Sequence, residues 1–143
     1  MATTVDALRR VLGDTFLMYT HSHISHWNVM GSGFPQYHSF LDGLYNDLFE
    51  AIDAVAEHIR AKSEFAPLSL TDLTRASAIL DSQVPVSWDG IRARLYAENE
   101  TLLEGLREAC VEAARENDQG LLNFLADRCD RHAKWAWMLR SSL

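Results

Sequence analysis

Hydrophobic residues recur every three or four positions along most of the chain, which is the spacing of one face of an α-helix. This period predicts long helices from about residue 3 to 30 and from about residue 35 to 62. A third long helix is expected to begin near residue 87, and a last one after the polar turn at 116–120. The positions expected to face a shared core include Leu8, Leu12, Leu41, Leu44, Leu48, Val55, Ile59, Leu95, Leu102, Leu106, Leu125 and Leu139.

The break between the second and third long helices is the longest in the chain. Residues 63–86 contain Pro67 and Pro85, and between them SLTDLTRASAIL can form a short helix capped by Ser69 or Thr71. A connection of this length can carry the chain along the molecule, so the two middle helices need not be antiparallel neighbours. The sequence therefore predicts an all-α four-helix bundle with a short extra helix between the second and third helices.

Length and composition fit a single domain over residues 1–143. Apolar residues make up 48% of the chain, which is enough for a substantial core. No run of eighteen apolar residues occurs, and MATTVDALRRVL has no apolar signal segment. A cytoplasmic protein without a transmembrane helix is therefore expected.

Charge and cysteine content narrow the functional classes. The formal net charge of −7 disfavours general attraction to nucleic acids and suits a protein that gathers cations. Cys110 and Cys129 lack CxxC spacing and occupy apolar helical positions. We interpret them as reduced core residues rather than as redox or metal-binding groups.

Three of the six histidines, His21, His23 and His26, fall close together beside Trp27 in the stretch HSHISHWNVMG. These three residues could belong to a metal site, to a proton-handling site or to a helix surface that is rich in imidazole. The choice between these readings depends on what the next helix places opposite them.

The second long helix carries further metal-binding side chains on one side. With His38 at zero and 100° per residue, Asp42, Asp53 and Glu57 lie at about 40°, 60° and 100°. The leucine stripe is centred elsewhere, near about 285°. Angles alone leave a solvated acidic surface equally open, but two large aromatic side chains on the same face favour a buried contact.

His38 and Asp53 cannot share one ion within a chain, because fifteen residues of helix, or about 22 Å along the axis, separate them. In a two-fold dimer a second copy of this helix can run antiparallel to the first. His38 of one chain would then approach Asp53 and Glu57 of the other. Two imidazoles with two carboxylates suit iron(II) or zinc.

The quoted histidine stretch and its continuation FPQYHSFLDGLYNDLFEAIDAVAEHI resemble the signature of the Dps proteins, or mini-ferritins. SLTDLTRASAI and the C-terminal HAKWAWMLR are also similar to segments of that family. The likeness covers essentially the whole chain. The spacing between His26, His38, Asp42, Asp53 and Glu57 is that of the family's ferroxidase ligands.

This resemblance implies a ferritin-like fold and a hollow, dodecameric capsule that oxidises iron(II), preferentially with hydrogen peroxide. The ferric product is stored inside, which protects against oxidative damage. The residues that match imply iron ligands His26 and His38 from one subunit, and Asp53 and Glu57 from its partner. Asp42 would hold a second, weaker iron.

The resemblance also implies positions for the residues around these ligands. Trp27 matches the family's tryptophan beside the site, where packing is favoured over electron donation. His23 matches the first histidine of the signature and is expected beside the ligands or at the interface. His21 has no counterpart in the signature and is expected at the surface.

The chain departs from the family where iron enters. An aspartate that lines the family's acidic three-fold pore is replaced here by Asn123, which weakens the charge of the pore. Asp127 and Asp130, on later turns of the last helix, can line that path instead, although ordinary solvent exposure explains them equally well. The glutamate of the family's HEK motif is Ala133.

Two other functions remain in competition. One is a DNA-compacting structural protein, which the negative charge and the absence of a Lys-rich tail disfavour. The other is a capsule in which the same ligands hold structural zinc at the dimer interface, and Asn123 is its only support in the sequence.

Overall fold

The computed structural model describes residues 3–142, so Met1, Ala2 and Leu143 of the predicted domain lie outside the described residues. The described chain forms five helices and no β-strand: α1 (Thr4–Asn28), α2 (Phe34–Ala61), α3 (Leu70–Arg75), α4 (Trp88–Arg115) and α5 (Gln119–Ser141). The predicted all-α bundle with a short extra helix is confirmed. None of the described helices is both long enough and apolar enough to cross a membrane.

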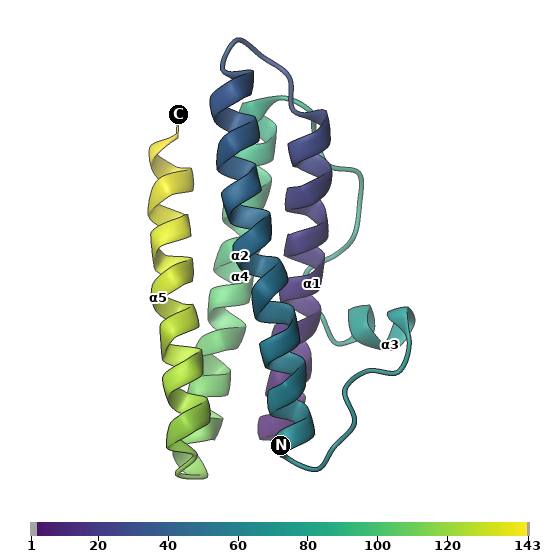
Figure 1. The fold of residues 1–143 in the computed structure, drawn as a ribbon, viewed down its shortest axis with the longest axis vertical. Coiled ribbons are helices and arrows are strands. Elements are labelled where there is room, and N and C mark those ends of the chain that lie inside the picture. The colour runs from purple at the N-terminus through teal and green to yellow at the C-terminus, as the bar shows by residue number, and fades with distance from the viewer. Residues whose placement is uncertain (1–2, 143) are drawn as a thin grey trace.

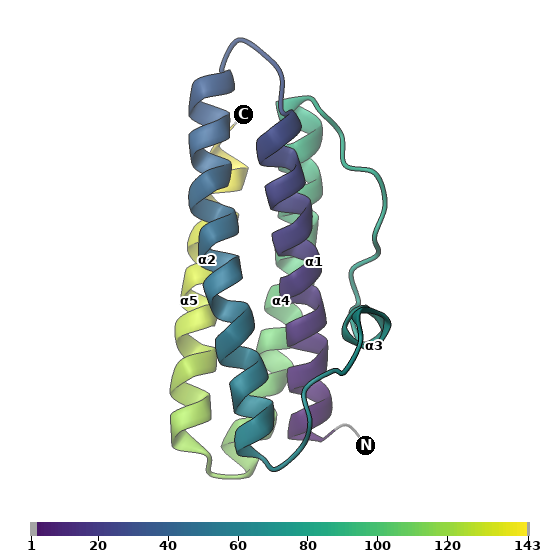
Figure 2. The same ribbon diagram turned by 45° about the vertical axis from the view of Figure 1, so that its right-hand side comes forward.

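The four long helices lie side by side in one bundle (Figure 1). Helix α1 packs against both α2 and α4, and α5 packs against α4. Helices α2 and α4 run in the same direction, because the connection between them returns along the outside of the bundle (Figures 1 and 2). The expectation that the middle helices need not be antiparallel neighbours is therefore confirmed. Helix α3 lies within this connection and contacts α1.

Leucines fill the centre of the bundle. All the core positions predicted above are buried, most of them completely. Cys110 and Cys129 are free thiols that pack against this core, as predicted, but each is only half-buried. Of the two residues considered as caps for the short helix, Ser69 is the one observed, and its hydroxyl accepts from the backbone N–H of Asp72 at 3.0 Å.

The short helix ends earlier than the sequence pattern allowed. Beyond it, the Asp14 carboxylate of α1 accepts a hydrogen bond from the Ser77 hydroxyl at 2.6 Å and another from the Ala78 N–H at 2.7 Å. These bonds turn the chain away from the helical path, so residues 76–86 follow an irregular course along the bundle.

His21 is completely buried, so its expected position at the surface is wrong. Its Nδ1 lies 2.7 Å from a carboxylate oxygen of Glu98, and its Nε2 lies 2.8 Å from one of Asp81. Arg94 also donates to Glu98 at 2.8 Å, and we call these four residues the His21 cluster. The surface prediction failed because α1 is covered by both α2 and α4, which gives it a second buried row of side chains.

A second buried cluster of polar side chains joins α5 to α2 and α4 by hydrogen bonds. Arg128 of α5 donates to Asp47 of α2 at 2.8 Å. Nearby, His132 Nδ1 donates to the side-chain oxygen of Asn99 on α4 at 2.7 Å, and its Nε2 accepts from Arg128 at 3.0 Å. Burial, and then the positive charge of Arg128, lower the pKa of His132 to about 3, so this imidazole is neutral.

Candidate metal centre

Two of the candidate ligands meet where α1 ends and α2 begins. The rings of His26 and His38 stack with their centroids 3.6 Å apart. Each Nδ1 donates to the backbone carbonyl oxygen of the other residue, at 2.8 Å in both directions. The turn between the helices contains Gly31 at a φ of 135°, a conformation that side chains rarely adopt. This turn reverses the chain and brings the two rings together.

The reciprocal hydrogen bonds determine which nitrogen of each ring can bind a metal. A carbonyl oxygen only accepts, so Nδ1 of each ring must carry the proton. Nε2 then keeps the lone pair that coordinates a metal ion. The same bonds hold both rings in place, so the pair offers two preorganised nitrogen atoms that could coordinate a metal ion.

Asp42 lies one turn after His38 and is held by a neighbouring phenol. The Tyr45 hydroxyl donates to Asp42 Oδ1 at 3.1 Å. The Tyr45 ring stacks face to face on His23, with centroids 3.9 Å apart. His23 therefore lies beside the candidate ligands, with its ring 6.1 Å from that of His26. Sequence reasoning missed the hydrogen bond from Tyr45, although the three-residue spacing from Asp42 could have suggested it.

Trp27 stands at the outer edge of this aromatic group. Its side chain is 63% exposed in the single chain, and its ring lies 4.8 Å from that of His23. Partial burial, and then the charge of His26, lower the pKa of His23. At neutral pH His23 is therefore an uncharged ring that can stack between Trp27 and Tyr45.

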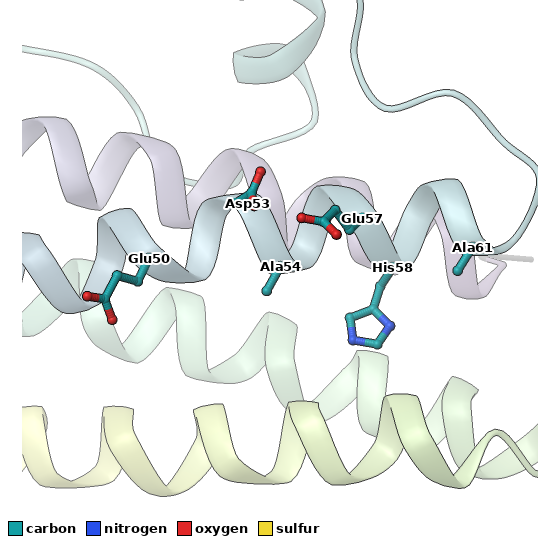
Figure 3. Close-up of a pocket in the computed structure, with 6 residues that line it drawn as sticks. All are labelled: Glu50, Asp53, Ala54, Glu57, His58 and Ala61. Carbon is teal, nitrogen blue, oxygen red and sulfur yellow. The ribbon is translucent and has the colours of Figure 1, made fainter.

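The two remaining candidate ligands lie further along α2. A hydrogen bond with Asp53, and then the charge of that residue, raise the pKa of Glu57. Asp53 and Glu57 border an open hollow of about 420 Å³. The His58 ring points from the same hollow toward α5, where it lies 4.8 Å from the ring of Phe124 (Figure 3). The hollow is lined by Glu50, Asp53, Ala54, Glu57, His58 and Ala61 (Figure 3).

The five candidate ligands thus lie in two separate groups: His26, His38 and Asp42 in one, and Asp53 and Glu57 in the other. Asp53 is fifteen residues from His38 on the same straight helix, or about 22 Å along its axis. Within residues 3–142 no group of three or more His, Cys, Asp or Glu side chains could hold a metal ion. One chain therefore presents two groups of candidate ligands on one side of the bundle, which we call half-sites, and neither could hold a metal ion by itself.

The candidate pore residues lie on a different helix from all five candidate ligands. Asn123 on the second turn of α5 is exposed and accepts a hydrogen bond from Gln119 at 2.8 Å. Asp127 and Asp130 follow on the same helix and are also exposed. Among the described residues, no hydrogen bond or ion pair joins these three side chains to either half-site.

Comparison with known proteins gives a consistent picture of the fold. Residues 5–143 match the family model described as a ferritin-like domain. The structure of the Dps protein from Vibrio cholerae O1, described as a member of the ferritin-like diiron-carboxylate superfamily, is similar, with a TM-score of 0.92 and 25% identity. That match covers 96% of this chain and 87% of the other.

Two curated relatives are similar over most of their length. A low temperature-induced protein of Nostoc, itself uncharacterised, is 31% identical over 96% of this chain and 78% of the relative. The DNA protection during starvation protein 2 of Bacillus anthracis is 24% identical over 97% of this chain and 95% of its own. These likenesses extend over all four long helices, and so over both half-sites.

Proposed function

Because this chain belongs to the ferritin-like family, in its Dps or mini-ferritin branch, we propose that it oxidises iron(II) and stores the ferric product. The proposed oxidant is hydrogen peroxide, and the proposed location is the cytoplasm. The proposed assembly is a hollow dodecamer in which the whole chain, residues 1–143, acts as one domain. Consuming iron(II) and peroxide together would protect the cell against oxidative damage.

The histidine pair at the turn between α1 and α2 is the observation that carries this proposal. Each ring donates through Nδ1 to the backbone, which leaves two Nε2 atoms directed by fixed hydrogen bonds. Such an arrangement is typical of imidazole ligands. In the proposed dimer these nitrogens face Asp53 and Glu57 of the partner subunit, and a two-fold axis generates two equivalent sites.

The proposed donor set suits iron as a substrate that changes oxidation state. Imidazoles retain the ferrous ion, and carboxylates favour the harder ferric product. Asp53 raises the pKa of Glu57 through a hydrogen bond and its negative charge, and an arriving dication would relieve that repulsion. Asp42, held by Tyr45, is the proposed ligand of a second, weaker iron. Zinc can occupy the same ligands as a substitute.

We propose that iron reaches the cavity along α5. Asn123 carries no charge, so the carboxylates of Asp127 and Asp130 on the later turns would supply the attraction for cations. All three side chains are exposed in the single chain and are free to line a channel between subunits.

The ligand assignment is tested by combining His26→Ala with Asp53→Ala in one chain. These changes remove one nitrogen and one oxygen ligand from every site. We expect the rapid absorbance rise after iron(II) and peroxide are mixed to fall by at least tenfold. His58→Ala is the matched control, because His58 lies on the same helix but packs toward Phe124. Oxidation at the wild-type rate by the double variant would show that the assignment is wrong.

We further propose that the protein does not bind DNA tightly. Each subunit carries a formal net charge of −7, which repels phosphate groups. In a gel-shift assay at low salt, duplex DNA should migrate unchanged in the presence of about micromolar protein. Retardation that disappears as salt is added would instead support the DNA-compacting alternative.

A further inference from the structure

Two thiols face each other across the α4–α5 hairpin. The sulfur of Cys110 on α4 lies 4.0 Å from that of Cys129 on α5. Both cysteines are free, half-buried and packed against the core. None of the proposed iron ligands lies on either of these helices. The pair is therefore a separate chemical group that iron oxidation does not use.

The geometry allows these two sulfurs to bond. A disulfide requires a separation of about 2.05 Å, so the sulfurs must approach by about 2 Å. Each sulfur swings about its own Cα–Cβ bond, so rotation of the side chains can supply most of this movement. The two helices are packed neighbours joined by the short turn after Arg115, so their backbones are already close.

We propose that Cys110 and Cys129 form a peroxide-reactive dithiol that closes to a disulfide within the chain. The Cys110 thiolate attacks one oxygen of a hydroperoxide, and the O–O bond breaks. Cys110 becomes a sulfenic acid, and the leaving oxygen takes a proton to become water or an alcohol. The Cys129 sulfur then attacks the sulfenic sulfur, the S–S bond forms as the S–O bond breaks, and the hydroxide leaves as water with the proton of the Cys129 thiol. Two electrons pass from the thiols to the peroxide.

The surroundings of the two sulfurs fit this division of roles. Burial, and then the charge of a neighbouring Cys110 thiolate, raise the pKa of Cys129 to about 11. Cys129 therefore remains a thiol at neutral pH and serves as the resolving group, while its contact with Cys110 places it ready to react. Because the site is half-buried, the reaction is slow and records prolonged exposure to peroxide.

The experiment uses the assembled protein stripped of iron with a chelator, so that peroxide can react only with the protein. After peroxide treatment the chains are denatured and alkylated. We expect both cysteines of each chain to escape alkylation, which leaves a mass about 2 Da below that of the reduced, unlabelled chain. Trypsin should release residues 108–115 linked to residues 129–131. Dithiothreitol should restore both thiols.

Cys110→Ser and Cys129→Ser are matched controls, since each keeps one thiol and should give no linked peptide. A second readout needs no variant: the oxidised wild-type protein should unfold several degrees above the reduced protein, because the cross-link restricts the unfolded chain. Retention of both thiols after treatment would overturn the proposal. Loss of the thiols as sulfinic acids, or as disulfides between chains, would overturn it equally.

Discussion

Two buried histidines have pKa values that are shifted in opposite directions. Burial alone lowers the pKa of His21, but the hydrogen bond and charge of Glu98, together with Asp81, outweigh it and raise the pKa above its ordinary value. Burial, and then the positive charge of Arg128, lower the pKa of His132 to about 3, and its Nδ1 donates to a neutral amide. Both nitrogens of the His21 ring face carboxylate oxygens, which favours the protonated ring, whereas the His132 ring is neutral.

This contrast predicts opposite pH dependences for His21→Gln and His132→Gln. Since the folded pKa of His21 is raised, its contribution is complete below about pH 6.5 and is lost as pH rises through the folded pKa. The destabilisation by His21→Gln, about 3–5 kcal/mol in acid, should shrink toward alkaline pH. The destabilisation by His132→Gln should instead grow up to about pH 6.5 and then stay constant.

Unfolding free energies of the wild-type protein and both variants, measured in urea from acid to alkaline pH, provide the test. A difference between wild type and His21→Gln that does not change with pH would mean that His21 is not charged in the folded protein.

At the scale of single elements, the close approach of α3 to α1 depends on one glycine. A Cβ atom added at Gly13 would lie 2.7 Å from the carbonyl oxygen of Leu73, which is backbone and cannot move alone. Gly43 also lies inside a long helix, but a Cβ atom there would meet only the Trp135 ring at 3.9 Å, an ordinary contact. The packing against α3 therefore leaves no room for a side chain at position 13, whereas position 43 can accommodate one.

Gly13→Ala should lower the free energy of unfolding by about 1–3 kcal/mol, since α3 must shift. Gly43→Ala should raise it by up to about 1 kcal/mol, because alanine favours helix. Thermal unfolding followed by circular dichroism compares the two changes directly. Equal shifts in the same direction would contradict the role assigned to Gly13.

The bounds of the long helices could be predicted from the sequence because their apolar period is local. The early end of α3 could not, since it is set by Asp14, which is 63 residues away from Ser77 in the chain. The burial of His21 was missed for the same reason, because Asp81 and Glu98 are distant in sequence. The reciprocal bonds of His26 and His38 depend on the backbone path of the turn, which spacing alone does not specify.

At the scale of the whole molecule, the separation of the two half-sites makes the partner essential to the proposed chemistry. In a mixed dimer of one His26→Ala chain and one Asp53→Ala chain, one site carries both changes and the other carries neither. Random pairing makes about half of the dimers mixed, so about a quarter of all sites are intact.

Mixing the two variants by unfolding and reassembling them together should therefore restore about a quarter of wild-type iron(II) oxidation. The same variants, reassembled separately and then combined, are the control and should stay inactive. Equal activity in both mixtures would show that each site is completed within one chain.

The outer connection between α2 and α4 also has a consequence for how the chain folds. Helices α1 and α2 form one hairpin and α4 and α5 another, and each can assemble from contacts that are close in sequence. The hydrogen bonds that Asp14 accepts from residues 77 and 78, and those between His21 and Asp81 and Glu98, close loops of 60 to 77 residues. Closing a long loop costs conformational entropy, and this cost slows folding. We therefore expect the docking of the two hairpins, together with the packing of the connection against α1, to limit the folding rate.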